Sequence, residues 1–429
     1  MTSKQIVFFG LMVTEALFTV KVSAQQVLTL EQCRQLALAT NNNLKISQQN
    51  IEGAKAQKAR ADVAGKPVLD GSVMGFYFGK PLSEILPEYV ISPGVGITQP
   101  VYAGGRIKLG KDAATKEIEI SEVQKIQTIA EVLLKTEIAY WQVVSVNERI
   151  KLAEQFKKKL DTLFTDLDNQ FKAGLIYKND VLRVKVQQNE NELNLIRARN
   201  ALVLSKLNLA QLIGRADSID FIIADSVIGS FNLVQMDDSL QQIITKRPEI
   251  MLLQKSLEAE TIREKMLRAD FKPTIGLQAN GISPFGKKGV NPTKPGNNAM
   301  VSYYALLNIS IPIFEWGAKK QKIKQQEYRI AAQQFQLKEA KELISLEVQQ
   351  AYIQLNESAK RVELSGTSLE QAEENLRLSN DRFKAGTIIG KDVLEAQTIW
   401  QQAYSNIIDA KVEYKVSEAN LKKALGEMK

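Results

Sequence analysis

The chain has 429 residues, of which 44% are hydrophobic and 24% charged, and its formal net charge is +8. It contains no histidine and a single cysteine, Cys33, which excludes an internal disulfide, a histidine metal site and a histidine general base. The Lys and Arg residues are scattered among Asp and Glu, a pattern typical of a solvated helical surface and not of a nucleic-acid partner.

The first 24 residues have the pattern of a secretory signal peptide. Lys4 provides a basic start, residues 6–13 are apolar, and Val22-Ser23-Ala24 forms a small-residue cleavage site. We therefore predict an exported mature chain that begins at Gln25. No later stretch reaches about 18 consecutive apolar residues, so no transmembrane helix is predicted. A chain of this kind can cross a membrane only as part of a closed β-barrel, because lipid leaves unpaired backbone groups unsatisfied.

An internal repeat organises the rest of the chain. Residues 171–182 and 383–394 are identical at eight of twelve positions, at an offset of 212. The same offset pairs Gly214 with Gly426, whereas Lys66-Pro67 pairs with Lys272-Pro273 at an offset of 206. The chain therefore consists of two copies of one unit. We place the first repeat at 25–214, an inter-repeat segment at 215–239 and the second repeat at 240–429.

Each repeat is predicted to begin with a helix and to continue with a β-hairpin, at about 67–102 and about 273–312. Apolar and polar residues alternate along 274–280 and 303–311, as in strands with two different faces. Clearer strands occur in the second copy than at 68–78 and 94–102 in the first. Residues 281–300 are rich in Gly and Pro and predict a long hairpin loop, and the shorter loop at 79–92 accounts for the six-residue difference.

Two long helices follow the hairpins, at 106–171 and 317–383, and shorter helices return from them at 178–213 and 390–426. The first long helix would span about 100 Å at 1.5 Å per residue. A heptad pattern predicts its buried seam, in which only Lys157 is polar and charged: Val143, Val146, Ile150, Ala153, Lys157, Leu160, Phe164, Leu167 and Phe171. The same positions in the second copy alternate large and small residues from Leu355 to Phe383.

Two hairpins provide four strands per chain, which is fewer than the eight that a membrane barrel requires. If the strands lie in a membrane, several chains must share one barrel. Two chains would provide eight strands and three would provide twelve. The strand count does not decide between them.

The residues at the helix reversals carry a family resemblance. The run Asp381-Arg-Phe-Lys-Ala-Gly-Thr387 is followed by Asp392-Val-Leu394, and a weaker copy occupies 171–182. Placed twice between heptad helices, this motif resembles the TolC-like outer membrane efflux proteins. The resemblance implies a mixed, mostly α fold and a homotrimer, in which a twelve-stranded barrel in outer-membrane lipid continues into a periplasmic α-barrel. Two departures are visible, since Gln170 stands opposite Arg382 and Phe occupies 171 and 383, where Tyr is frequent in the family.

The resemblance also implies a function, that of a passive exit duct for small molecules. A periplasmic adaptor protein would dock on the helix reversals and connect the duct to an inner-membrane pump. The implied docking residues are Phe171, Gly174, Asp180, Val181, Leu182, Arg382, Phe383, Gly386, Thr387, Asp392, Val393 and Leu394. Gly174 and Gly386 also suit a chain reversal that needs positive φ, and we expect both Phe side chains to pack inside the tips. By resemblance alone, 215–239 is expected to form a belt around the helices.

Asp392 and Glu395 are three residues apart and share a helix face. The helix dipole favours carboxylates at the start of a helix, and this structural reason alone could explain both residues. The resemblance implies a second account, an acidic ring that sets cation selectivity at the periplasmic entrance. The first copy has Asp180 but Arg183 at these positions, so we expect no equal ring from it.

Two other functions remain open at this point. The same duct could be an outlet for type I protein secretion, or the chain could be a soluble periplasmic coiled-coil scaffold with a small sheet. Catalysis is not predicted, because the sequence has no Gly-rich phosphate loop and no zinc-type spacing. We predict no cofactor and no metal. The substrate, the adaptor and the resting state of the tip cannot be derived from the sequence.

Overall fold

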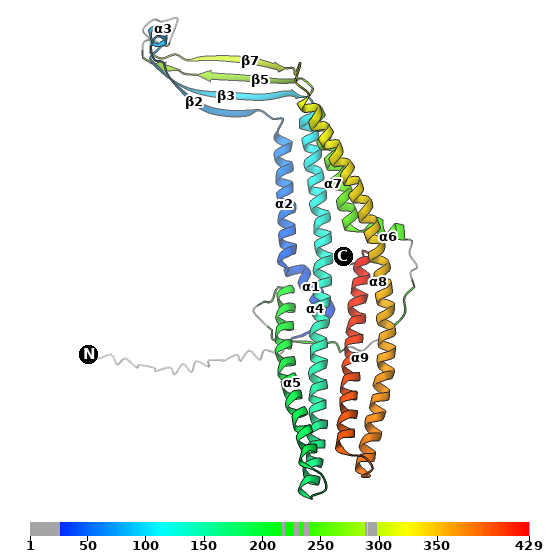
Figure 1. Ribbon diagram of the computed structural model, residues 1–429. Coiled ribbons are helices and arrows are strands. Elements are labelled where there is room, and N and C mark those ends of the chain that lie inside the picture. The colour runs from blue at the N-terminus through cyan, green and yellow to red at the C-terminus, as the bar shows by residue number, and fades with distance from the viewer. Residues whose placement is uncertain are drawn as a thin grey trace, which may run out of the picture.

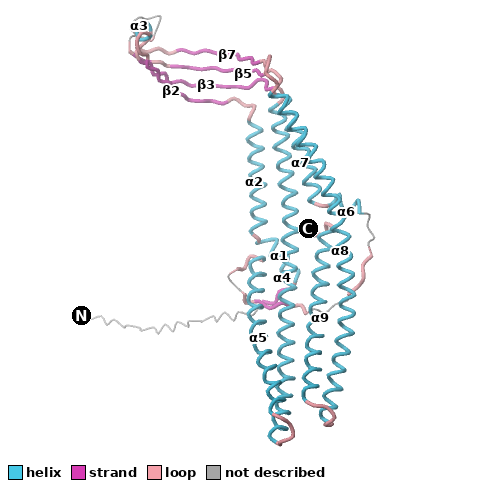
Figure 2. Tube along the Cα trace, in the orientation of Figure 1, coloured by secondary structure: helices cyan, strands magenta, loops and turns pink. Residues whose placement is uncertain are grey.

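The computed structural model describes residues 26–216, 219–226, 231–235, 240–287, 290 and 298–428. The predicted signal peptide, 1–24, lies outside the described residues. Figure 1 shows a long rod of helices with an antiparallel sheet at one end and two helix reversals at the other. Figure 2 shows the loops that reverse the helices at the end of the rod opposite the sheet of long strands.

The two halves of the chain contain matching elements. In the first half these are α1 (Leu30–Thr40), α2 (Asn42–Val63), β2 (Val68–Tyr77), β3 (Tyr89–Ala103), α4 (Arg106–Lys172) and α5 (Lys178–Leu212). The second half has α6 (Leu240–Lys246), α7 (Pro248–Ala269), β5 (Thr274–Ile282), β7 (Ser302–Ser310), α8 (Ala318–Lys384) and α9 (Gly390–Ala424). Helices α4 and α8 each have 67 residues, and α5 and α9 each have 35. Four short elements complete the described chain: β1 (Gln26–Leu28), α3 (Leu82–Ile85), β4 (Phe221–Ile223) and β6 (Phe285–Gly286).

Helix α4 runs the full length of the rod. It packs against α2 and α7 in the half near the sheet, and against α5 and α9 in the half near the reversals. Helix α8 packs against α7 and then against α9. The helices therefore form one curved layer, in which α8 forms one edge and α2 and α5 form the other.

The predicted seam of α4 is confirmed at Val143, Val146, Leu160 and Leu167, but the buried stripe differs from it elsewhere. Near the tip the buried residues are Leu152, Phe156, Leu160, Leu163 and Leu167. Lys157 was predicted in the seam, but its Nζ pairs with Glu192 Oε2 at 2.6 Å on the surface, and Phe156 is buried instead. The reason is that α4 packs against both α5 and α9, so its buried stripe is wider than a two-helix seam and is displaced along the sequence. In α8 the predicted seam is confirmed at Leu355, Ser358, Val362, Ala372 and Leu376.

The four long strands pair antiparallel in the order β2, β3, β5 and β7, and β6 pairs with β3. Strand β3 begins at Tyr89, earlier than the predicted 94, because it continues to pair with β2 up to Tyr77. The two hairpins are thus neighbours in one sheet. Within the described chain, β2 and β7 are the edge strands.

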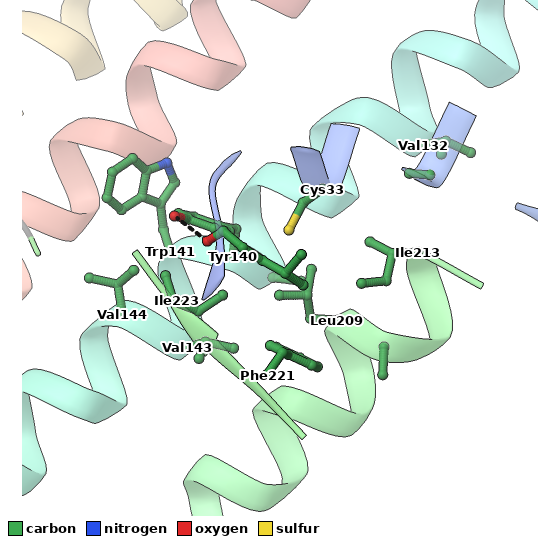
Figure 3. Packing of buried hydrophobic residues seen from close by; sticks show 14 of the residues in the cluster. Cys33, Val132, Tyr140, Trp141, Val143, Val144, Leu209, Ile213, Phe221 and Ile223 are labelled. Atoms are coloured by element: carbon green, nitrogen blue, oxygen red, sulfur yellow. Dashed lines mark hydrogen bonds between the residues drawn. The ribbon is translucent and has the colours of Figure 1, made fainter. Parts of the chain in front are cut away.

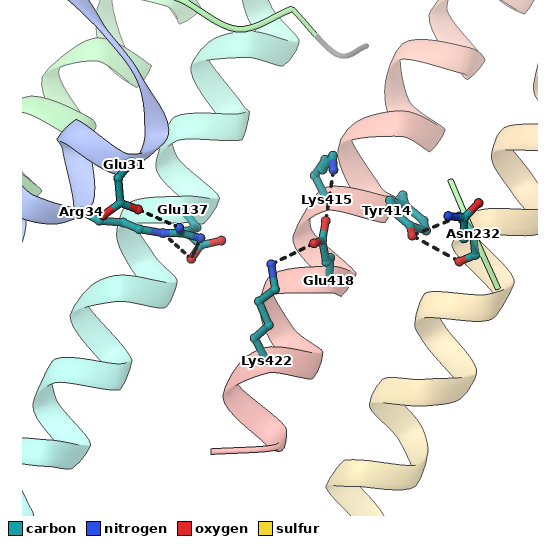
Figure 4. Close-up of polar contacts among 8 residues, drawn as sticks. All are labelled: Glu31, Arg34, Glu137, Asn232, Tyr414, Lys415, Glu418 and Lys422. Carbon is teal, nitrogen blue, oxygen red and sulfur yellow. Dashed lines mark hydrogen bonds and ion pairs between the residues drawn. The ribbon is translucent and has the colours of Figure 1, made fainter. Parts of the chain in front are cut away.

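A core at the middle of the rod joins the beginning of the described chain to the segment after α5. Strands β1 and β4 pair in parallel, and Leu28, Cys33 and Phe221 are buried beside α4 and α5 (Figure 3). The hydroxyl of Tyr140 donates to Asp225 Oδ2 at 2.5 Å. Further along, the Asn232 amide N–H donates to the hydroxyl of Tyr414 at 3.3 Å (Figure 4). The described parts of 215–239 therefore contact both α4 and α9, while the belt around an assembly stays a prediction.

The break in the first helix of each repeat is closed by a different side chain. Between α1 and α2, Asn41 Nδ2 donates to the Leu212 carbonyl at 2.9 Å. Between α6 and α7, Arg247 Nη1 donates to the Ala424 carbonyl at 2.8 Å. Leu212 and Ala424 end the equivalent helices α5 and α9. Each repeat therefore caps the end of its returning helix from its own broken first helix, with a different donor.

Candidate functional site: sheet faces and helix reversals

The strand register separates apolar from polar side chains across all four long strands. One face collects apolar and small residues in cross-strand rows: Leu69, Gly71, Val73, Gly75 and Tyr77 from β2; Tyr89, Ile91, Pro93, Val95 and Ile97 from β3; Ile275, Leu277, Ala279 and Gly281 from β5; and Tyr303, Ala305, Leu307 and Ile309 from β7. The exception is Gln99, whose Nε2 donates to the Gly65 carbonyl at 2.8 Å near the base of the sheet. The side chains of this face are mostly exposed in a single chain.

The opposite face holds the polar side chains of the strands, mixed with a smaller number of apolar ones: Asp70, Ser72, Ser92, Thr98, Gln278, Asn280, Ser302, Tyr304, Asn308 and Ser310. Neighbouring members contact one another, since Gln278 Nε2 lies 3.4 Å from Asn280 Oδ1. A sheet with one apolar and one polar face suits lipid on the first side and water on the second.

Aromatic side chains lie near both ends of the apolar face. Tyr77 and Tyr89 are paired at the end far from the helices. Phe314 and Trp316 follow β7 near the helices, where both are exposed and their rings meet edge to face at 5.2 Å. Such aromatic girdles border the lipid-facing band of outer-membrane barrels.

The first reversal joins α4 to α5 through Gly174, which has φ +76. The Leu175 amide N–H donates to the Gln170 carbonyl at 2.9 Å, which is the bonding of a Schellman cap. Leu175 and Tyr177 are 75% and 82% exposed at this tip. Two of the predicted residues of this reversal, Val181 and Asp180, are respectively buried and half-buried in the first turn of α5, and Leu182 is exposed.

The second reversal has the same backbone form. Gly386 has φ +71, and both the amide N–H and the hydroxyl of Thr387 donate to the Arg382 carbonyl at 3.0 Å. Val393 is buried, while Phe383 and Leu394 are half-buried against the same cluster that contains Val181. The structure thus brings part of each predicted tip into one core and leaves Arg382 and Thr387 exposed. Phe171 differs from the expectation that it packs inside its tip, because it is 39% exposed.

Asp392 and Glu395 both lie exposed at the start of α9. Asp392 Oδ2 accepts a hydrogen bond from the Ile389 amide N–H at 3.3 Å. Asp392 therefore stabilises the helix start, as its position in the first turn favours. A role of this pair at a channel entrance stays a prediction.

A close contact between the second reversal and α4 was not found from the sequence. A Cβ on Gly390 would lie 2.6 Å from Leu167 Cδ2, so any larger residue would force the buried Leu167 side chain to shift. Nearby, Lys159 Nζ lies 4.6 Å above the ring of Trp400, and Gln397 Nε2 lies 3.4 Å from the Lys159 carbonyl. The sequence does contain one sign of this contact, because the first copy has Lys178 at the position equivalent to Gly390. The hairpin of α8 and α9 is therefore packed tightly on α4.

In the part of the chain that the structure describes, no helix is both long and apolar enough to cross a membrane. Across the same residues, no three Cys, Asp or Glu side chains are grouped so that they could hold a metal ion.

Comparisons with known proteins agree on one family and one fold. The sequence model of the family described as outer membrane efflux protein matches residues 33–215 and 239–427. Outer membrane protein TolC of Escherichia coli (strain K12) is 24% identical over 310 residues, which cover 69% of this chain and 61% of TolC. The alkaline protease secretion protein AprF of Pseudomonas aeruginosa is 21% identical over 299 residues, or 68% of this chain and 60% of AprF. The chain thus matches about three fifths of the length of these relatives.

A third relative matches over most of its length. The cation efflux system protein CusC of Escherichia coli (strain K12) is 21% identical over 404 residues, covering 91% of this chain and 84% of CusC. A crystal structure of CusC superposes with a TM-score of 0.78 at 17% identity, over 92% of this chain and 91% of that one. This likeness shows a shared fold.

Proposed function

The chain belongs to the outer membrane efflux protein family, and we propose that three copies of it form a passive exit duct for small molecules. In this proposal a periplasmic adaptor protein docks on the helix reversals and connects the duct to an inner-membrane pump. The four strands of each copy contribute to a shared twelve-stranded barrel, and the helices form a periplasmic tube. The chain conducts and has no catalytic role.

The observation that carries the proposal is the division of the sheet into an apolar and a polar face. Soluble proteins rarely expose an apolar face as large as this one, which runs across four strands and is bordered by aromatic residues. A barrel in lipid requires this face on the outside and places the polar face toward water in the lumen.

The free edges of the single chain support assembly with further copies. Strands β2 and β7 have unpaired edges among the described residues, and lipid does not tolerate such edges. Helix α8 exposes Tyr328 and Phe335 at its edge of the layer, and α5 exposes Val186 and Leu204 at the opposite edge. Head-to-tail contacts between unlike edges generate a closed ring when the rotation between successive copies closes. The family resemblance favours three copies for this ring.

The reversals are the surfaces proposed to dock the adaptor. Leu175, Tyr177 and Leu182 expose apolar area at the first reversal, at the end of the rod farthest from the sheet. Arg382 and Thr387 are the exposed predicted contacts at the second. Asp392 and Glu395 are proposed to form the acidic entrance.

One observation favours a second candidate function. The similarity to AprF, whose name describes alkaline protease secretion, makes an outlet for protein secretion the alternative. The same duct serves both functions, so the inner-membrane partner distinguishes them. Co-purification of the full chain with a small-molecule pump or with a protein-secretion transporter would separate the two.

The first experiment is the mass of the detergent-solubilised full chain by analytical ultracentrifugation, corrected for bound detergent. Three copies with ion conductance in planar bilayers support the proposal. A protein that is monomeric, or that stays soluble without detergent, contradicts it and favours the scaffold.

The entrance is tested by the double substitution Asp392→Asn/Glu395→Gln. We expect lower cation selectivity and weaker block by divalent cations in bilayer recordings, because the ring loses its negative charge. The matched control is Asp180→Asn at the first reversal, where Arg183 stands opposite Glu395. Equal effects of both variants, or none from either, would contradict the assignment.

A further inference from the structure

One charged side chain occurs in the four long strands of the sheet. Strand β2 contains Asp70, and β3, β5 and β7 contain no Asp, Glu, Lys or Arg. A carboxylate in a strand that is proposed to cross a membrane is costly unless it faces water. The function of the reversals does not account for this residue, because it lies at the other end of the molecule.

The register places Asp70 on the polar face. Its cross-strand partner is Gly96, which pairs in turn with Asn280. A Cβ built on Gly96 would meet Asn280 Oδ1 at 2.5 Å, so the Asn280 side chain lies on this face. Directly opposite residues in an antiparallel pair share a face. The side chain of Asp70 therefore points to the same side as the amide of Asn280.

The carboxylate of Asp70 is exposed and not neutralised. Its partner Gly96 has no side chain that could cover it, and among the described residues no ion pair includes Asp70. The nearest cationic residue in the sequence is Lys66, which precedes Asp70 by four residues and lies outside β2. Its negative charge thus acts on the solvent next to the polar face.

We infer that Asp70 is a second determinant of ion selectivity in the duct, located in the barrel and separate from the entrance. The inference rests on the proposed function, since three copies would place three such carboxylates at one level of the lumen. Negative charge in a pore raises the local concentration of cations and lowers that of anions. The proposal fixes the direction of the effect, toward cations.

The two acidic levels act independently because of their separation. Strand β2, which contains Asp70, lies beyond one end of α4, and the start of α9, which contains the entrance residues, lies near its other end. The 67 residues of α4 span about 100 Å at 1.5 Å per residue, whereas charges are screened over about 10 Å in 0.1 M salt. Removing one ring therefore leaves the field of the other unchanged.

The first test is the reversal potential of single channels in a salt gradient. Asp70→Asn should reduce the cation-to-anion permeability ratio by about twofold in salt near 0.1 M, and by much less near 1 M, where the screening length is about 3 Å. Asn280→Asp adds a carboxylate in the same row and should raise the ratio. Ser72→Asn adds an amide on the same face without a change of charge and is the matched control.

A second test uses chemical accessibility and does not depend on selectivity. Cys33 is fully buried, and burial raises the pKa of its thiol to about 11, so the wild-type chain gives little background with thiol reagents. In Asp70→Cys, an anionic methanethiosulfonate should restore the wild-type selectivity, and a cationic one should lower the cation-to-anion permeability ratio further. In Leu69→Cys, on the apolar face, water-soluble reagents should have no effect on channels in lipid.

The outcomes separate this inference from the function on which it depends. If the wild-type chain forms no channels, the proposed function fails. If channels form but Asp70→Asn conducts with unchanged selectivity at low salt, the inference is wrong while the duct stands. Modification of Leu69→Cys in place of Asp70→Cys would overturn the assignment of the faces and with it the inference.

Discussion

Arg247 and Asn41 cap equivalent helix ends at very different electrostatic cost. Asn41 contributes one amide hydrogen bond to the Leu212 carbonyl. Arg247 is 2% exposed and brings a buried charge, which Glu249 and Glu347 neutralise at 2.9 and 3.0 Å. A buried ion pair contributes little net stability, but removal of one partner leaves the other charges without compensation. Both side chains cap the end of a returning helix, but we expect substitution of Arg247 to destabilise the protein more than substitution of Asn41.

We expect Arg247→Ala to lower the free energy of unfolding by about 2–3 kcal/mol, less than the loss of one member of a fully buried pair, because the Glu249 and Glu347 side chains are 30% and 40% exposed. Asn41→Ala should cost about 1–2 kcal/mol, as for other capping side chains. Denaturant unfolding of the detergent-solubilised protein, followed by circular dichroism, measures both. Equal losses would show that Arg247 acts through its single bond to the Ala424 carbonyl.

Glu249 links this site to pH. Burial raises the pKa of its carboxyl, but the hydrogen bonds and charge of Arg247 lower it more, so the pKa lies below its usual value. A depressed pKa adds stability that is present above the unfolded pKa, near 4.3, and is lost as the pH falls through the folded one. We therefore expect wild type to lose more stability than Glu249→Gln between about pH 6 and pH 3. Parallel pH curves for the two proteins would contradict this linkage.

At the scale of elements, the close packing of α9 on α4 sets the position of the second reversal. Gly390 permits an approach to Leu167 at which a Cβ would overlap the Leu167 side chain. Leu167 is itself buried in a cluster shared by α4, α5, α8 and α9. The contact therefore fixes one hairpin against the other near the proposed entrance.

A double-mutant cycle tests this contact. Gly390→Ala should destabilise the protein because the new methyl group overlaps Leu167, and overpacking of this kind costs about 1–3 kcal/mol. Leu167→Ala should cost about 2–5 kcal/mol by leaving a cavity. In the double variant the added methyl group has space, so the combined loss should be smaller than the sum of the two. Strict additivity, measured by denaturant unfolding, would show that the residues do not interact.

The long helices show which buried residues could be predicted from the sequence and which could not. The heptad pattern located the buried residues of α8, which packs mainly along one side, against α7 and α9. In α4 it placed Leu160 and Leu167 correctly but misplaced Lys157 and Phe171, because α4 packs against both α5 and α9 and its buried stripe is displaced from a two-helix seam. The face of Asp70 could not be assigned from the sequence, because apolar residues such as Val68 and Leu69 occur in both alternating sets of β2, and only the cross-strand register separates the faces. The same limit applies to Gly390, whose partner Leu167 is remote in sequence.

At the scale of the whole molecule, the single chain leaves its two lateral edges uncovered. Tyr328 and Phe335 are exposed on the edge helix α8, and Val186 and Leu204 are exposed on α5 at the other edge. Exposed apolar side chains of this kind mark surfaces that become buried when copies associate. The stability of the protein is then inseparable from that of its assembly.

Phe335 provides a test of this edge, since it is 72% exposed in the single chain. Phe335→Glu should weaken the proposed trimer, because the interface would have to bury a carboxylate in place of an aromatic ring. The neighbouring substitution Gln336→Glu adds the same charge on a different side of α8 and serves as the control. Ultracentrifugation in detergent over a range of protein concentrations measures both. Unchanged assembly of Phe335→Glu would place this side chain outside the interface.

The equal length of α4 and α8 restricts how such a chain can evolve. Inserting one residue in α4 would turn everything beyond it by about 100° and advance it by about 1.5 Å, which separates the buried residues from their partners. A seven-residue insertion restores the facing side chains, but only if α5 lengthens with α4 and both helices of the other hairpin change by the same amount. Lineages that have altered the reach of this rod should therefore differ by whole heptads that occur in both halves of the gene.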